Sequence, residues 1–147
     1  DAMARILTQL SGAAADAVHM TAPDREGAGA ARAIRAALDD AGRAPADVGF
    51  VSAHGTGTPY NDAMEAAALT RVFGAGRVPV NSIKGALGHT MGAAAALEAI
   101  MCLLAARDGL LPPTVGYEEP DPDCTLDYVP GACRAARPRL PKGPHAP

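Results

Sequence analysis

Two short apolar segments, residues 48–53 and 78–81, each run directly into a glycine-rich segment that carries a histidine. The first continues as His54-Gly-Thr-Gly-Thr58 and the second as Lys84-Gly-Ala-Leu-Gly-His89. Both apolar segments have strand length, and a helical pattern follows each of them. Strands that alternate with helices favour an α/β architecture with a mostly parallel sheet, in which functional loops gather at the carboxyl ends of strands. We therefore expect both histidines at such ends.

Two further helices are expected around the first strand. Apolar residues recur at helical spacing over residues 27–41, and Gly42 ends this pattern. The other helix follows the first histidine segment. Asn61 or Asp62 can cap its N-terminus, and it should continue to about Phe73, before a Gly-Ala-Gly turn.

The Ala-rich segment that runs to about Arg107 is the most apolar part of the chain. Its small residues would lie on all sides of a helix, which predicts burial on more than one face. Weaker strand patterns cover residues 4–10 and 126–129. Prolines become frequent in the last quarter of the sequence. We expect one domain over residues 1–133, followed by a disordered or extended Pro/Arg-rich tail over residues 134–147.

Composition and charge exclude several classes of function. The net charge of -3 leaves no clustered basic face for nucleic acid. The most apolar stretch is shorter than the about 20 residues of a membrane span and contains Glu98. Three cysteines at irregular spacing fit neither a disulfide framework nor a zinc site. We therefore expect a reducing, cytoplasmic setting, no membrane and no bound metal.

The histidine pair is the strongest candidate for chemistry. A single histidine after a strand is more often a loop residue with satisfied hydrogen bonds, but two in matching positions favour catalysis. A neutral imidazole has a free N–H that can stabilise a developing oxyanion, and the neutral form is available at pH 7. Thr56 and Thr58 add hydroxyls that could hold a polar ligand. The other two histidines, His19 and His145, are interpreted as a loop residue and a tail residue.

Four charged residues close to these segments have competing interpretations. Glu98 lies within the apolar helix and needs a cation or donors, and Lys84 is the nearest cation in the sequence. An ion pair that only fixes the second histidine segment and a direct role in the site are equally good interpretations. Asp62 and Glu65 have the spacing of a capping box, which we favour over catalysis.

No cysteine is placed as a nucleophile. Cys102 falls in the apolar helix and should be an inert small side chain, whereas Cys124 and Cys133 lie in the proline-rich region without a neighbouring histidine. Histidines of this kind without a nucleophile suggest that the chain is part of a larger catalytic unit.

Three segments together resemble the C-terminal half of the β-ketoacyl-acyl carrier protein synthases: Asp16-Ala-Val-His-Met-Thr-Ala-Pro23, Ala53-His-Gly-Thr-Gly-Thr-Pro59 with Asn61-Asp62, and Lys84-Gly-Ala-Leu-Gly-His-Thr-Met-Gly-Ala-Ala94. The resemblance runs from about residue 4 to about residue 133. It implies half of a thiolase-like fold, in which two similar α/β halves stack into layers of helices and sheets. Family members form homodimers or pair with a sister subunit.

The resemblance also implies a reaction of fatty-acid or polyketide synthesis. An acyl chain is held on a cysteine of the N-terminal half, and malonyl-acyl carrier protein is decarboxylated to the carbanion equivalent that attacks it. His54 and His89 match the two catalytic histidines of the family. Lys84 and Glu98 match a buried pair that organises the site.

The remaining matches concern the substrate and the loops. Thr56 and Thr58 match the threonines that hydrogen-bond the phosphopantetheine arm of the acyl carrier protein. Asp62 and Glu65 match acidic positions that support the loop network. The resemblance thus implies an acyl carrier protein as partner and the phosphopantetheine arm as the substrate carrier, with no cofactor bound by the chain itself.

Two departures from the family stand out. The half that carries the nucleophilic cysteine has no counterpart, and Arg137 to Pro147 replaces the usual Asn-x-Phe-Gly-Phe-Gly-Gly loop and the strand after it. A split gene, a frameshift and a truncation all stay open. We expect no condensing activity from the chain alone. A non-catalytic subunit like a chain-length factor and an inert fragment are the alternatives to a catalytic half.

Overall fold

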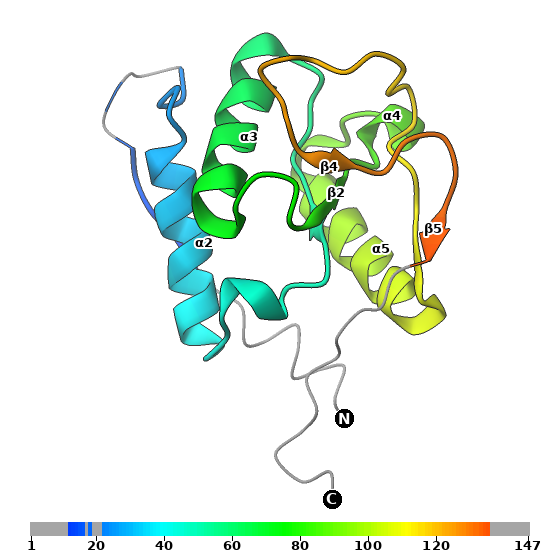
Figure 1. The fold of residues 1–147 in the computed structure, drawn as a ribbon, viewed down its shortest axis with the longest axis horizontal. Helices are drawn as coiled ribbons and strands as arrows, with labels where there is room; N and C mark the ends of the chain where they lie inside the picture. The colour runs from blue at the N-terminus through cyan, green and yellow to red at the C-terminus, as the bar shows by residue number, and fades with distance from the viewer. Residues whose placement is uncertain (1–11, 17, 19–21, 136–147) are drawn as a thin grey trace, which may run out of the picture.

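The computed structural model describes residues 12–16, 18 and 22–135 of the 147-residue chain. The strand expected over residues 4–10, the two histidines without an assigned role and residues 136–147 of the expected tail lie outside the described residues. The described elements, in chain order, are α2 (Ala28–Asp40), η1 (Pro45–Asp47), β1 (Val51–Ser52), α3 (Pro59–Phe73), β2 (Pro79–Asn81), α4 (Lys84–Leu87), η2 (Met91–Ala93), α5 (Ala94–Asp108), β3 (Leu110–Leu111), β4 (Asp127–Tyr128) and β5 (Arg134–Ala135) (Figure 1).

The main sheet has the strand order β1-β2-β4, and all its strands are parallel. Val80 of β2 is in register with Val51 of β1 and with Tyr128 of β4. The expected parallel sheet is thus confirmed, although its strands are shorter than the apolar segments that predict them. β3 and β5 form a separate antiparallel pair, which the sequence pattern did not indicate.

Helices cover both faces of this sheet. On one face, Val80 joins a buried cluster with Leu69 of α3, and Ile34 of α2 packs against the same cluster. On the other face, Asn81 contacts Met101 of α5, with 4.0 Å between Asn81 Nδ2 and Met101 Sδ. Adjacent residues of β2 therefore point to opposite helical layers, as the alternation of a strand requires. The result is the expected α-β-α layering, with α2 outside α3 (Figure 1).

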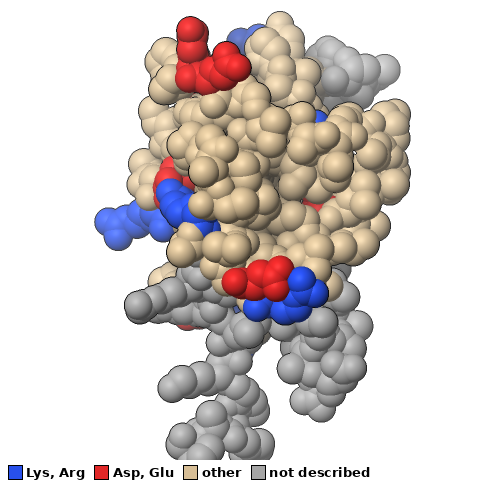
Figure 2. Space-filling model, turned by 90° about the vertical axis from the view of Figure 1, so that its right-hand side faces the viewer, with Lys and Arg blue, Asp and Glu red and all other residues tan. Residues whose placement is uncertain are grey.

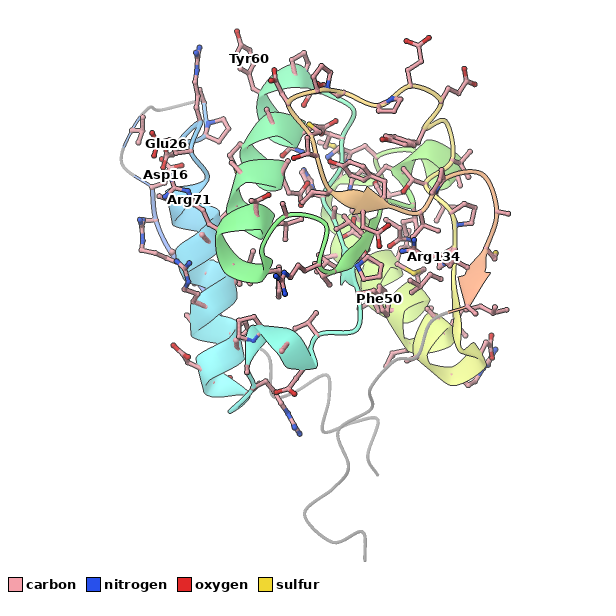
Figure 3. The ribbon with its side chains drawn as sticks, in the orientation of Figure 1. Asp16, Glu26, Phe50, Tyr60, Arg71 and Arg134 are labelled. Atoms are coloured by element: carbon pink, nitrogen blue, oxygen red, sulfur yellow. The ribbon has the colours of Figure 1, made fainter. Side chains whose placement is uncertain are left out.

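Two ion pairs join neighbouring elements of this fold. Arg71 of α3 donates to Glu26 at 2.6 Å and ties α3 to the turn before α2 (Figure 3). Arg134 of β5 binds the carboxylate of Asp127 in β4 through two hydrogen bonds, of 2.8 and 2.9 Å. Arg134 was expected in the tail, but it forms part of β5.

The start of α3 differs from the expected one. Thr58 is the N-cap residue and Pro59 the first helical residue, so Asn61 and Asp62 lie inside the first turn instead of capping it. Proline suits this position because the first N–H of a helix needs no intrahelical partner. The end of the helix at Phe73 agrees with the expectation.

The Ala-rich helix α5 ends as expected, because Gly109 adopts the left-handed conformation at φ 66°. The expected burial on more than one face is wrong for the described chain. Only Ala94 and Ala105 of this helix are buried, whereas Ile100 is 53% exposed and Leu104 is 44% exposed. Within the described residues one face of α5 packs on the sheet and nothing covers the other. Few charged side chains lie across the middle of the surface on this side of the molecule (Figure 2).

None of the helices in the described part of the chain combines the length and apolar character that a bilayer crossing needs.

Candidate functional site

The two histidine segments meet at the carboxyl ends of neighbouring parallel strands. His54 follows β1 after one residue, and His89 follows β2 and the short helix α4. Their ring centroids lie 5.3 Å apart with an interplanar angle of 85°, an edge-to-face contact. Both residues are exposed, so a substrate can reach the rings. The structure therefore brings together the two imidazoles that the sequence singles out.

A backbone hydrogen bond fixes which nitrogen of His89 can donate. The N–H of Met91 donates to Nδ1 of His89 at 3.1 Å. Because Nδ1 accepts, a neutral ring carries its proton on Nε2, which is then free to donate to a ligand. Met91 adopts φ 52°, a left-handed conformation that is unfavourable for a residue with a side chain. No local pattern in the sequence predicts this strained turn.

The His54 segment is held by Glu65 from inside α3. Oε1 of Glu65 accepts the N–H of His54 at 2.7 Å, and Oε2 accepts the N–H of Gly55 at 2.9 Å. The capping-box interpretation of Asp62 and Glu65 is therefore wrong. The helix begins at residue 59, so Asp62 is not its N-cap residue, and the Glu65 side chain binds the His54 loop instead. Asp62 accepts a hydrogen bond from the Asn61 side chain at 3.0 Å.

Lys84 and Glu98 form the predicted ion pair. Nζ of Lys84 donates to Oε1 of Glu98 at 2.5 Å, and the exposed fractions of the two side chains are 6% and 18%. Lys84 begins the short helix α4, and Glu98 belongs to α5. The pair thus joins the His89 segment to the helix that follows it.

A cavity of about 410 Å³ lies beside the two segments. Thr56, Lys84 and His89 border it, and the hydroxyls of Thr56 and Thr58 lie 2.9 Å apart. Thr114 and Tyr117 from the connection between β3 and β4, and Tyr128 of β4, also line the cavity. No sequence pattern singled out these residues. Burial raises the pKa of Tyr128 well above its ordinary value, so the phenol stays protonated.

Neither Cys102 nor Cys124 supplies a reactive thiolate. Burial raises the pKa of Cys102, and burial together with the carboxylate of Asp121 raises the pKa of Cys124. Cys124 borders the cavity, but a raised pKa keeps its thiol protonated, and only the thiolate is a good nucleophile. Cys133 is exposed. In the described part of the chain no group of three histidine, cysteine or acidic side chains could hold a metal ion.

The chain matches the family model of the β-ketoacyl synthase C-terminal domain over residues 6–118. It belongs to the β-ketoacyl synthase family. The ketoacyl synthase alpha subunit of the tetracenomycin polyketide synthase from Streptomyces glaucescens is 49% identical over 124 residues, which are 83% of this chain and 29% of that protein.

Solved structures of ketosynthases share the fold. The ishigamide ketosynthase/chain length factor is 50% identical with a TM-score of 0.81, over 86% of this chain and 31% of that one. A second structure is described as AntDE:AntF, a type II polyketide synthase acyl-carrier protein in complex with its ketosynthase. It is 37% identical with a TM-score of 0.84, over 88% of this chain and 32% of that one. The expected half of a thiolase-like fold is thus confirmed. The chain spans about a third of the length of these relatives.

Proposed function

We propose that the chain supplies the C-terminal half of a β-ketoacyl-acyl carrier protein synthase. In this proposal it joins malonyl-acyl carrier protein to an acyl chain held as a thioester on a cysteine of the N-terminal ketosynthase half. The observation that carries the proposal is the contact of the His54 and His89 rings, with centroids 5.3 Å apart, at the ends of adjacent strands. Two N–H donors that converge from such positions suit a single thioester oxygen.

The reaction follows from charge development. The carbonyl oxygen of the malonyl thioester accepts one hydrogen bond from each of the two imidazoles. On His89 the donor is the Nε2–H group. The bond to the malonyl carboxylate breaks, carbon dioxide leaves, and its electron pair passes into an enolate whose oxygen the imidazoles stabilise. The enolate carbon then attacks the acyl thioester carbonyl, and the cysteine leaves as thiolate. No oxidant or metal is needed for this balance.

The other site residues have supporting roles in the proposal. The buried ammonium of Lys84 adds positive charge beside the His89 segment, and Glu98 holds it in place. Glu65 keeps the His54 loop in its bent conformation by accepting two backbone N–H groups. The paired hydroxyls of Thr56 and Thr58 would bind the phosphopantetheine arm.

The exposed apolar face of α5 indicates where the N-terminal ketosynthase half would pack. Ile100 and Leu104 on this face are each more than two-fifths exposed, and so are Leu87 of α4 and Met91 of η2, which precede α5 in the chain. Side chains of this size seldom gather on a surface that stays in water. Because the relatives are about three times as long as the matched region, the remainder of a ketosynthase is the partner that fits this face.

Reconstitution tests the proposed function. The chain is mixed with the N-terminal portion of the tetracenomycin ketoacyl synthase alpha subunit, malonyl- and acyl-loaded carrier protein are added, and the ketoacyl product is measured. His54→Ala and His89→Ala should each lower the rate by about 10²–10³-fold, the cost of removing one oxyanion donor. His145→Ala is the control of matched residue type and should retain the wild-type rate.

The two outcomes of the reconstitution separate the alternatives. Condensation that survives the double replacement of both site histidines would contradict the catalytic proposal and leave the subunit like a chain-length factor. Binding of the N-terminal portion without any condensation by the wild-type chain would contradict it as well.

A further inference from the structure

Ser82 lies between the two histidine segments and is hydrogen-bonded to both. It follows β2 directly and is 7% exposed. Its hydroxyl donates to the carbonyl oxygen of Gly55 at 3.0 Å, next to His54. The hydroxyl oxygen of Ser82 in turn accepts the N–H of Lys84 at 3.3 Å, at the start of the segment that ends in His89. One buried hydroxyl thus joins the two loops that carry the rings.

The approach of the first loop to Ser82 depends on a glycine. Gly55 has φ +43°, and a Cβ at this position would lie 2.6 Å from Cβ of Ser82 and 2.8 Å from its hydroxyl oxygen. Any other residue would therefore push the loop away from the hydroxyl as well as strain its backbone. Glu65 binds the backbone N–H groups of this loop, whereas Ser82 binds the backbone carbonyl group of Gly55.

Ser82 is itself fixed to the sheet. Its N–H donates to Oγ1 of Thr114 at 3.3 Å, and the N–H of Thr114 donates to the carbonyl oxygen of Val129 at 2.7 Å, just after β4. A chain of hydrogen bonds therefore leads from the end of β4 through Ser82 to Gly55. The hydroxyl is a rigid reference point, because it is buried and its neighbours on both sides are backbone groups.

We propose that Ser82 is a positioning residue that sets the distance between the His54 and His89 rings. Without its hydroxyl, the Gly55 carbonyl loses its donor and the first loop is free to move away from the second. The value of this spacing for catalysis rests on the proposed function, whereas the spacing itself can be measured without any activity.

The test uses nuclear magnetic resonance on the full 147-residue chain with isotope-labelled histidine rings. At a centroid separation of 5.3 Å, the wild-type rings should give cross-peaks between their protons, assigned with His54→Asn and His89→Asn. Ser82→Ala should abolish these cross-peaks while the amide spectrum stays that of a folded chain. Ser52→Ala is the matched control, because among the described residues no hydrogen bond joins the Ser52 hydroxyl to either segment. It should leave the cross-peaks unchanged.

A second variant approaches the same contact from the other side. Gly55→Ala places a methyl group against Ser82 and should also abolish the cross-peaks. If Ser82→Ala does not fold, Ser82→Cys replaces it, because a thiol keeps the size of the side chain and donates only weakly. Inter-ring cross-peaks of wild-type intensity in the folded Ser82 variant would overturn the proposal. Loss of the cross-peaks supports it even if the reconstituted enzyme makes no product, so the two proposals can fail separately.

Discussion

Replacing Glu98 by leucine leaves the ammonium group of Lys84 buried without its carboxylate. The lysine side chain is only 6% exposed and the glutamate side chain 18% exposed, so the lysine is the more costly partner to strand. Breaking a buried pair costs about 3–5 kcal/mol, because desolvation of the remaining charge is no longer compensated. We expect Glu98→Leu to lower the free energy of unfolding by about 3 kcal/mol and Lys84→Met by about 2 kcal/mol.

The double variant should be more stable than the two single effects predict. With both charges gone, only imperfect packing of the new side chains remains, at about 1–2 kcal/mol. The coupling free energy of the cycle is then about 3–4 kcal/mol, at or above the usual range for residues in contact. Urea unfolding of the four proteins gives these values, and each kcal/mol should also change the melting temperature by about 2–4 °C.

An exposed ion pair provides the control for this cycle. Arg71 and Glu26 also lie within hydrogen-bond distance, but their side chains are 45% and 75% exposed. Pairs of this kind contribute about 0–1 kcal/mol, so the cycle of Arg71→Met and Glu26→Leu should show little coupling. If the coupling free energy of Lys84 and Glu98 is as small as that of the surface pair, the conclusion that burial makes their contact important is refuted.

Two further predictions concern the His54 loop and the cysteines. Glu65→Gln keeps one acceptor oxygen for two backbone N–H groups, so it should cost about 1–3 kcal/mol and speed hydrogen exchange at the His54 amide; wild-type exchange would contradict this. Iodoacetamide should modify the exposed Cys133 first. Because the raised pKa values of Cys102 and Cys124 mean less thiolate at a given pH, their alkylation should need a higher pH, and mass spectrometry that finds Cys124 modified first at pH 7 would disprove this order.

The sequence predicts the parts of this molecule that depend on local pattern. Alternating strands and helices indicate the parallel sheet, and because parallel strands end at one edge, they also predict that His54 and His89 meet there. The partner of Glu98 could be found in the same way, since a charged residue in an apolar helix requires one.

Contacts between distant segments were harder to predict. The spacing of Asp62 and Glu65 fits a capping box, yet the Glu65 carboxylate binds a loop that lies next to it only in the folded chain. The left-handed turn at Met91 is equally invisible in the sequence, because such a conformation persists only when the surrounding structure fixes it. The sequence pattern also overestimated the burial of the Ala-rich helix. Under the proposed function, the N-terminal ketosynthase half would cover the face of this helix that the described residues leave exposed.

A second polypeptide that covered the bare side of α5 would link the folding of this chain to mass action. A ligand that binds only the native form raises the unfolding free energy with its own concentration, by about 2.7 kcal/mol at a hundred times the dissociation constant. If a second polypeptide covers Ile100 and Leu104, the thermal midpoint should climb as that polypeptide is titrated in. Cells that make the two in unequal amounts would then lose the surplus of this one to aggregation or proteolysis.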